Sequence, residues 1–187
     1  GISEVTGAAI YLSNQTASIV ATPSTGYKFS SWTVNSGNTP ASTTTASTTV
    51  SMSKATTLTA NGVLKTYTIT VKSGTGGSVK VEDTTKSTSV TAASGETKTL
   101  SVTHGDTIKV TATAGSGYTL STLKHGSTSM SSGGTFTASG TETVEATWAA
   151  NTAKITINKD GSAWSASGIK VTLYNGTTAT SYTTTVS

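Results

Sequence analysis

A segment that occurs twice constrains the fold of this chain more than any other feature. Residues 21–32 read ATPSTGYKFSSW, and residues 112–123, about 91 positions later, read ATAGSGYTLSTL. Both copies have an apolar-alternating lead-in, a Gly-Tyr corner, and apolar residues two and five positions after the Tyr. Matching segments at a fixed offset indicate that one small unit was duplicated. The sequence therefore predicts a modular array of small domains, and it does not suggest an enzyme.

The composition favours strands throughout the chain. Ser and Thr make up about 40% of the 187 residues, far above ordinary usage, and 33% of the residues are hydrophobic. Thr and Val suit a pleated surface because they branch at Cβ, whereas no window shows the sustained apolar stripe of a helix. We expect an all-β fold with little or no helix, built from tandem small β modules with several thin cores.

Turn and strand signals divide the chain into three parts. The first β repeat spans residues 1–65, and its strand at 17–22 stops at Pro23, which cannot donate a ladder hydrogen bond. The second, divergent repeat spans 66–150 and opens on a strand in which Tyr, Ile and Val alternate with Thr. Residues 151–187 hold too few strands for an independent sandwich. We expect them to be strands of a third, partial module, which either packs on the second unit or begins a further one.

The order of these signals resembles the divergent internalin-B-type repeats of bacterial surface proteins. The first unit matches through Ala-Thr-Pro, through Gly-Tyr-Lys-Phe followed by Trp32, and through a closing strand in Leu-Thr-Ala-Asn. The second unit matches through Gly76-Gly77 and the Gly-Tyr corner at Tyr118, and it departs where Leu123 replaces the Trp. The first unit lacks the opening Gly-Gly strand of this pattern, so we expect its first strand to be lost or borrowed from a neighbour.

This resemblance implies a non-catalytic repeat in a large bacterial protein that is secreted or sits at the cell surface. It implies a compact β fold, either β-grasp-like or sandwich-like. The expected location is extracellular, and the expected partners are the neighbouring domains of the same chain. The final segment resembles the start of a Cna-B-type stalk module, in which Lys159 would stand where such a module carries the lysine of an isopeptide crosslink.

We interpret the aromatic corner as core. In such a thin module a large aromatic side chain supplies most of the burial. A core accepts Leu123 in place of Trp32, whereas a binding platform would lose its ring. Trp164, in a loop of small residues, is the candidate binding residue, and the loop Asn35–Thr45 is the alternative site. The predicted structural core residues are Tyr27, Phe29, Trp32, Tyr118, Leu120, Leu123 and Trp148.

Other functional classes lack the residues that they need. The chain has no Cys, and its two histidines, His104 and His125, lie in turns without a carboxylate cluster, so we expect no metal site. It has no Gly-x-Ser-x-Gly elbow and no phosphate-binding loop, so we expect no enzyme activity and no cofactor. The net charge of +4 comes from scattered lysines, which argues against nucleic-acid binding, and no apolar run is long enough to enter a membrane.

Two main functions remain after these exclusions, and a third class, an accessory domain of an enzyme, differs from them only in the neighbouring domains. The first is a structural spacer or stalk that presents another domain, in which each unit has its own small core. The alternative is an adhesin-type binding module for an extracellular glycan or a host protein. A surface rich in hydroxyl groups resists non-specific contacts and favours the spacer, whereas exposed aromatic side chains gathered on one face would favour the adhesin.

Overall fold

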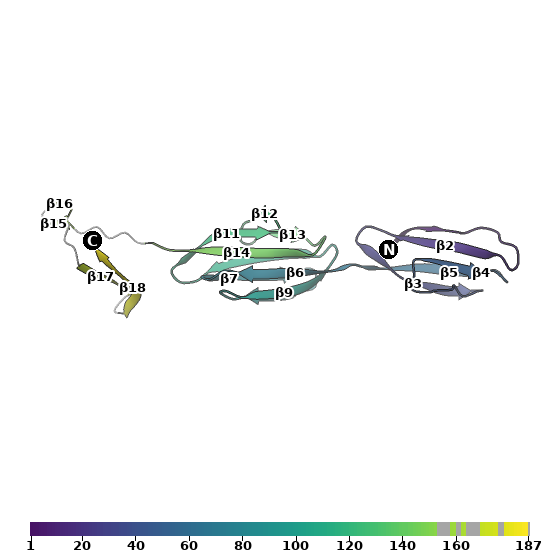
Figure 1. Ribbon diagram of the computed structural model, residues 1–187, viewed down its shortest axis with the longest axis horizontal. Helices are drawn as coiled ribbons and strands as arrows, with labels where there is room; N and C mark the ends of the chain where they lie inside the picture. The colour runs from purple at the N-terminus through teal and green to yellow at the C-terminus, as the bar shows by residue number, and fades with distance from the viewer. Residues whose placement is uncertain (153–157, 160–161, 164–168, 176–177, 187) are drawn as a thin grey trace. The chain divides into compact units, whose positions relative to one another are not determined.

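The computed structural model describes residues 1–152, 158–159, 162–163, 169–175 and 178–186. Every regular element among these residues is a β-strand, which confirms the prediction of an all-β chain of tandem modules (Figure 1). Within the same residues no helix is long and apolar enough to span a membrane. The part of the chain whose side chains are described contains two apolar cores, one in residues 1–65 and one in residues 66–150. We call these two stretches the first and the second module.

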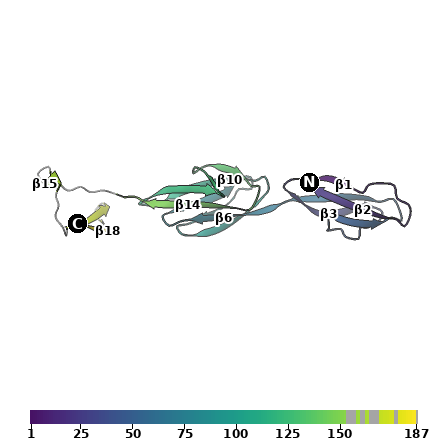
Figure 2. The same ribbon diagram turned by 45° about the horizontal axis from the view of Figure 1, so that its top comes forward.

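Two β-sheets enclose the core of the second module. Its strands are β6 (Thr66–Ser73), β7 (Gly77–Asp83), β8 (Thr88–Ala92), β9 (Thr97–Thr103), β10 (Thr107–Ala114), β11 (Tyr118–His125), β12 (Thr128–Ser129), β13 (Thr135–Thr137) and β14 (Glu142–Ala150). One sheet has the order β13-β10-β7-β8, and the other has the order β12-β11-β14-β6-β9. Figure 2 shows β10 on one side of the module and β14 and β6 on the other. The module is therefore a sandwich, in which β6 runs parallel to β14.

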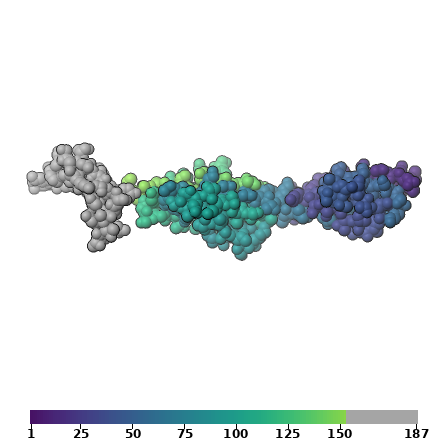
Figure 3. All heavy atoms as spheres, turned by 60° about the horizontal axis from the view of Figure 1, so that its bottom comes forward, coloured from purple at the N-terminus to yellow at the C-terminus, as the bar shows by residue number. Residues whose placement is uncertain are grey.

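Alternation along the strands explains how the two sheets pack. In β6 every second residue faces inward, and Ile69 and Val71 are fully buried. β10 buries Ile108 and Val110 in the same way from the opposite sheet. Each such side chain stabilises the fold by roughly 1.5–3 kcal/mol when it is fully buried. With all heavy atoms drawn, the second module is one continuous body on the face in view (Figure 3).

The first module is smaller. Its strands are β1 (Ile2–Thr6), β2 (Thr16–Pro23), β3 (Tyr27–Ser36), β4 (Ser47–Ser51) and β5 (Thr57–Leu64). β1, β2 and β4 form one sheet in the order β1-β2-β4, and β3 pairs with β5 to form the other. The buried residues of the core between them are Ile19, Ala21, Trp32 and Val50.

The two modules repeat the same strand pairings. Tyr27 pairs with Leu64 as Tyr118 pairs with Ala150, and both ladders shift register at the same distance beyond the tyrosine. β3 and β11 therefore carry the same bulge after the Gly-Tyr corner. β1 takes the position of β7, because β1 pairs with the edge of β2 opposite β4, as β7 pairs with the edge of β10 opposite β13.

A matching turn precedes β2 and β10. Leu12 N donates to Gln15 Oε1 at 2.8 Å, and Thr103 N donates to Asp106 Oδ2 at 2.6 Å. The residue before each acceptor has a positive φ in both turns. Because the turns correspond, the residues that lead into them correspond as well. Residues 8–12 therefore take the position of the end of β9, although they form no strand.

The first module has no counterpart of β6. In the second module β6 lies between β14 and β9. In the described part of the chain β5 pairs with β3 alone, so the edge of β5 that corresponds to the β6 side of β14 is unpaired. Residues 8–12 then have no strand beside them with which to pair. This explains why they form a loop where the second module has β9.

The last part of the chain forms a compact unit of its own, residues 152–187. Within it β15 (Asn158–Lys159) pairs with β16 (Ser162–Ala163) in one antiparallel hairpin. β17 (Ile169–Asn175) pairs with β18 (Thr178–Val186) in another. Among the described residues, the strands that the sequence predicts for this segment form two hairpins.

A buried aspartate closes the turn before β10. Asp106 is 4% exposed, and its carboxylate accepts hydrogen bonds from the backbone N and the hydroxyl of Thr103 and from Lys86 Nζ. Burial by itself raises the pKa of Asp106, but these hydrogen bonds outweigh burial and lower the pKa from 3.8 to about 2. The folded state therefore favours the charged form of the Asp106 carboxylate.

We expect Asp106 to make the second module sensitive to acid. Because its pKa is lower in the folded than in the unfolded chain, its charge stabilises the fold above about pH 4, and this contribution is lost as the pH falls towards about 2. Asp106→Asn should lower the free energy of unfolding by about 1.5–3 kcal/mol at neutral pH. The variant and the wild type should converge near pH 2. Urea unfolding at both pH values checks this, and a gap of equal size at both would contradict it.

Candidate binding surface

The seven residues predicted to form the cores differ in burial. Trp32 and Leu123 are 4% and 3% exposed, and they pair with Ala60 and Ala146 at matching positions of the two modules. Trp32 Nε1 also donates to Thr45 O at 2.9 Å. The partly exposed residues are Tyr27, Phe29, Tyr118, Leu120 and Trp148. Trp32 is therefore a buried core residue.

Two aromatic rings cover the Gly76-Gly77 pair of the second module. A Cβ on Gly76 would overlap with the Tyr118 ring, and one on Gly77 would lie 2.5 Å from the Trp148 ring. Gly76 also has a φ of +119°, which residues with a Cβ rarely adopt. Trp148 Nε1 donates to Ser73 Oγ at 3.1 Å, which fixes the ring. The pair is glycine because no larger residue fits under these rings.

The first module uses the opposite arrangement at this end of the core. The register of β1 places Ile2 at the position of Gly77. Gly62 occupies the position of Trp148 on β5, and a Cβ on Gly62 would lie 3.1 Å from Ile2 Cδ1. The large residue and the glycine have exchanged strands. The path of the Gly-Gly strand is thus retained as β1, and the strand that is absent is the one that precedes it.

Of the two binding sites suggested by the sequence, the described residues include only the loop Asn35–Thr45. The loop Asn35–Thr45 is held by hydrogen bonds to the module: Asn38 Oδ1 accepts from the backbone N of Ser53 and of Lys54. Pro40 in the same loop is buried. These contacts hold the loop in place against the module. Trp164 lies outside the described residues.

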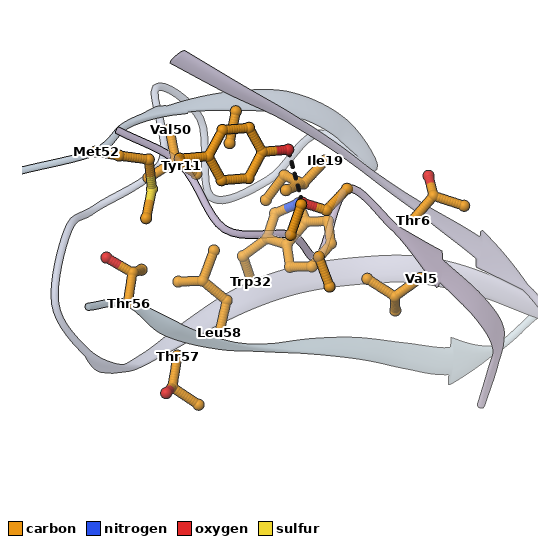
Figure 4. Close-up of a pocket in the computed structure, with 14 residues that line it drawn as sticks. Val5, Thr6, Tyr11, Ile19, Trp32, Val50, Met52, Thr56, Thr57 and Leu58 are labelled. Atoms are coloured by element: carbon orange, nitrogen blue, oxygen red, sulfur yellow. Dashed lines mark hydrogen bonds between the residues drawn. The ribbon is translucent and has the colours of Figure 1, made fainter. Parts of the chain in front are cut away.

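A cavity of about 260 Å³ opens into the core of the first module (Figure 4). Its lining includes the core side chains of Trp32 and Ile19. Figure 4 shows Tyr11 above Trp32 and Leu58 to the left of it. The Tyr11 hydroxyl donates to Gly7 O at 3.0 Å, which holds the Tyr11 ring over the cavity.

The cavity lies beside the unpaired edge of β5. Residues 8–12 contribute one part of its lining, and residues 56–58 contribute another. A neighbouring hollow of about 450 Å³ is lined by residues 9–13 and 52–56. Ile10 and Leu12 beside it are 101% and 72% exposed. Exposed apolar side chains next to an apolar cavity are typical of a binding surface. We call the space between residues 8–12 and 56–60 the open slot.

The chemistry of this surface suits the binding of an apolar segment. The described residues that line the cavity include no carboxylate, imidazole or amine. Elsewhere, His125 Nδ1 lies 2.9 Å from Glu142 Oε2, and its ring stacks on Phe136 with centroids 4.4 Å apart. Among the residues that the structure describes, no group of three or more His, Cys, Asp or Glu is placed to hold a metal ion.

The open slot is not visible in the local sequence pattern. The aromatic corner at Trp32 and Tyr27 carries a clear signal, whereas residues 8–12 carry none and Leu58 belongs to the predicted closing strand. The signal that pointed in this direction was the missing first strand of the first unit. Which edge its absence leaves open depends on strand pairing, and no local pattern encodes that pairing.

A comparison with known families agrees with this architecture. The model of the divergent InlB B-repeat domain matches residues 2–61 and 87–152, which is more than half of the chain. These two stretches contain the Gly-Tyr corner and most of the closing strand of each module. No curated protein and no solved structure matches the chain. The chain belongs to the divergent InlB B-repeat domain family.

Proposed function

We propose that this chain is a non-catalytic tandem repeat region of a bacterial cell-surface or secreted protein, where it acts as a spacer that presents another domain. The observation that carries this proposal is the separation of the two cores. The buried residues of the first core all lie in residues 1–65, and those of the second all lie in residues 66–150. Modules with separate cores hold a distal domain away from a surface without needing a site of their own.

The composition of the surface supports the same function. Ser and Thr provide about 40% of the chain, and charged residues provide 11%. A surface of hydroxyl groups stays hydrated without strong charge and resists non-specific contacts along a long array. The family to which the chain belongs is a repeat family, which fits use in tandem.

Forced unfolding of the full chain between two handle domains tests the spacer proposal. The two modules should unfold in separate events, which extend the chain by up to roughly 230 Å for residues 1–65 and 300 Å for residues 66–150. Val144→Ala should lower the unfolding force of the longer event alone, because Val144 is 0% exposed in the second core. A single event that releases both lengths would contradict the proposal.

One observation favours a second candidate function, an adhesin-type module for an extracellular glycan or a host protein. The open slot exposes apolar side chains, among them Ile10 and Leu12. Its lining is mostly aliphatic and backbone, which suits a protein ligand better than a sugar. Screening the full chain against glycans and matrix proteins separates the two functions, since a spacer alone binds none of them saturably.

A further inference from the structure

We propose that the open slot of the first module accepts an extended peptide strand from outside residues 1–187. The strand runs parallel to β5, and it alternates apolar with hydroxyl-bearing side chains, as β6 does. This inference goes beyond the spacer function and does not depend on it.

The second module shows what this position holds when it is filled. β6 pairs in parallel with β14, where Val144 lies opposite Val71, and it pairs antiparallel with β9, where Leu100 lies opposite Ile69. Ile69 and Val71 are 0% exposed. The position between β14 and β9 thus holds one strand whose alternate side chains enter the core.

The backbone of β5 is oriented to receive such a strand. In β14, Ala146 O accepts from Gly74 N at 2.9 Å, so Ala146 directs its backbone polar groups to the β6 side. Alternate residues of a strand face the same side, so Val144 does so as well. The counterparts of these two residues in the first module are Ala60 and Leu58. A strand edge with free N–H and C=O groups is a template for strand addition.

The cavity of the first module lies at the position that Ile69 and Val71 fill in the second module. The register of β6 places Ile69 opposite Glu142 and Val71 opposite Val144. The corresponding residues of the first module, Thr56 and Leu58, both line the cavity. An incoming strand would therefore insert two apolar side chains where the second module has Ile69 and Val71.

The residues on the two sides of the open slot indicate that its occupant is a single strand and not a second copy of the chain. Residues 8–12 take the position of β9, and in the second module the position between β9 and β14 holds one strand, β6. Symmetric pairing of β5 with β5 of a second copy would be antiparallel and would bring a whole sheet against residues 8–12. The described residues that line the cavity carry no charge, and Lys54 is the one charged residue that lines the neighbouring hollow, so the side chains that the strand inserts into the core are apolar.

A peptide with the sequence of β6, TYTITVKS, is the probe, with both ends capped. Titrated into the ¹⁵N-labelled full chain, it should shift the amide signals of residues 8–12 and 56–60 saturably. Hydrogen exchange at Leu58 and Ala60 should slow. The amides of residues 98–102 and 142–146 should not change, because β6 already fills their slot.

Altered peptides separate strand addition from general stickiness. The same peptide with Ile69→Thr and Val71→Thr should bind about tenfold more weakly or worse, because it lacks the two buried side chains. A peptide that is N-methylated at alternate residues, so that it cannot donate to β5, should lose binding as well.

Matched protein variants locate the site. Ala9 is exposed and lines both hollows, so Ala9→Glu should leave the fold intact and weaken peptide binding by about tenfold or more. Ser101 is exposed on β9 in the second module, and Ser101→Glu should leave binding unchanged.

Several results would overturn the proposal. They are the absence of saturable shifts, equal binding of the original and the Thr-substituted peptide, and shifts that fall outside the open slot. A dimer that protects β5 without peptide would also overturn it, because the occupant would then be a second copy. Each of these results leaves the spacer proposal standing, since that proposal rests on separate cores and is tested by forced unfolding.

Discussion

Replacing Trp32 with alanine should unfold the first module and leave the second module folded. Trp32 is 4% exposed, its ring centroid lies 5.5 Å from that of Phe29, and its Nε1 donates a hydrogen bond to Thr45 O. Emptying this position should cost about 3–5 kcal/mol. A module of 65 residues has roughly 3–10 kcal/mol of stability in total. In an NMR spectrum of the full chain, the amides of residues 1–65 should collapse to unfolded shifts, while those of residues 66–150 keep their positions.

Two variants serve as controls for this prediction. Trp32→Leu introduces the residue that the second module has at Leu123, so the first module should stay folded with a smaller loss of stability. Leu123→Ala should destabilise the second module by about 2–5 kcal/mol and leave the signals of the first module unchanged. If Trp32→Ala kept the spectrum of the first module, the core would depend on other side chains than the one proposed.

Gly77→Ile should destabilise the second module by about 3 kcal/mol or more, and the added change Trp148→Gly should recover much of this loss. A Cβ at Gly77 would lie 2.5 Å from the Trp148 ring, so isoleucine cannot fit beneath it. Removing the ring makes the space that isoleucine needs. The first module already has this combination, with Ile2 on β1 and Gly62 on β5.

Urea unfolding of the wild type, the two single variants and the double variant measures this coupling. Trp148→Gly alone should cost about 3–5 kcal/mol, because it empties one end of the core. The double variant should be more stable than the sum of the two single effects by about 2 kcal/mol. Strictly additive effects would show that the two positions do not share one space.

Local patterns were sufficient to predict much of the first and second modules. The strands at 17–22 and 67–71 were visible because apolar and polar residues alternate, and the corner at Tyr27 was visible because Gly-Tyr recurs at Tyr118. The partial exposure of Tyr27 and Tyr118 was not predicted. It depends on how each ring sits at the end of its sandwich.

The sequence by itself determined that this chain is all-β and that it repeats one small unit, because strand propensity and alternation are properties of neighbouring residues. Only the tertiary structure decided that β6 is the strand without a counterpart in the first module, since strand order joins residues far apart in the chain. The exchange of Ile2 and Gly62 for Gly77 and Trp148 also appears only there, because the two members of each pair meet across strands. The repeated Gly-Tyr corner reveals the duplication, and the packing around it reveals what one copy lacks.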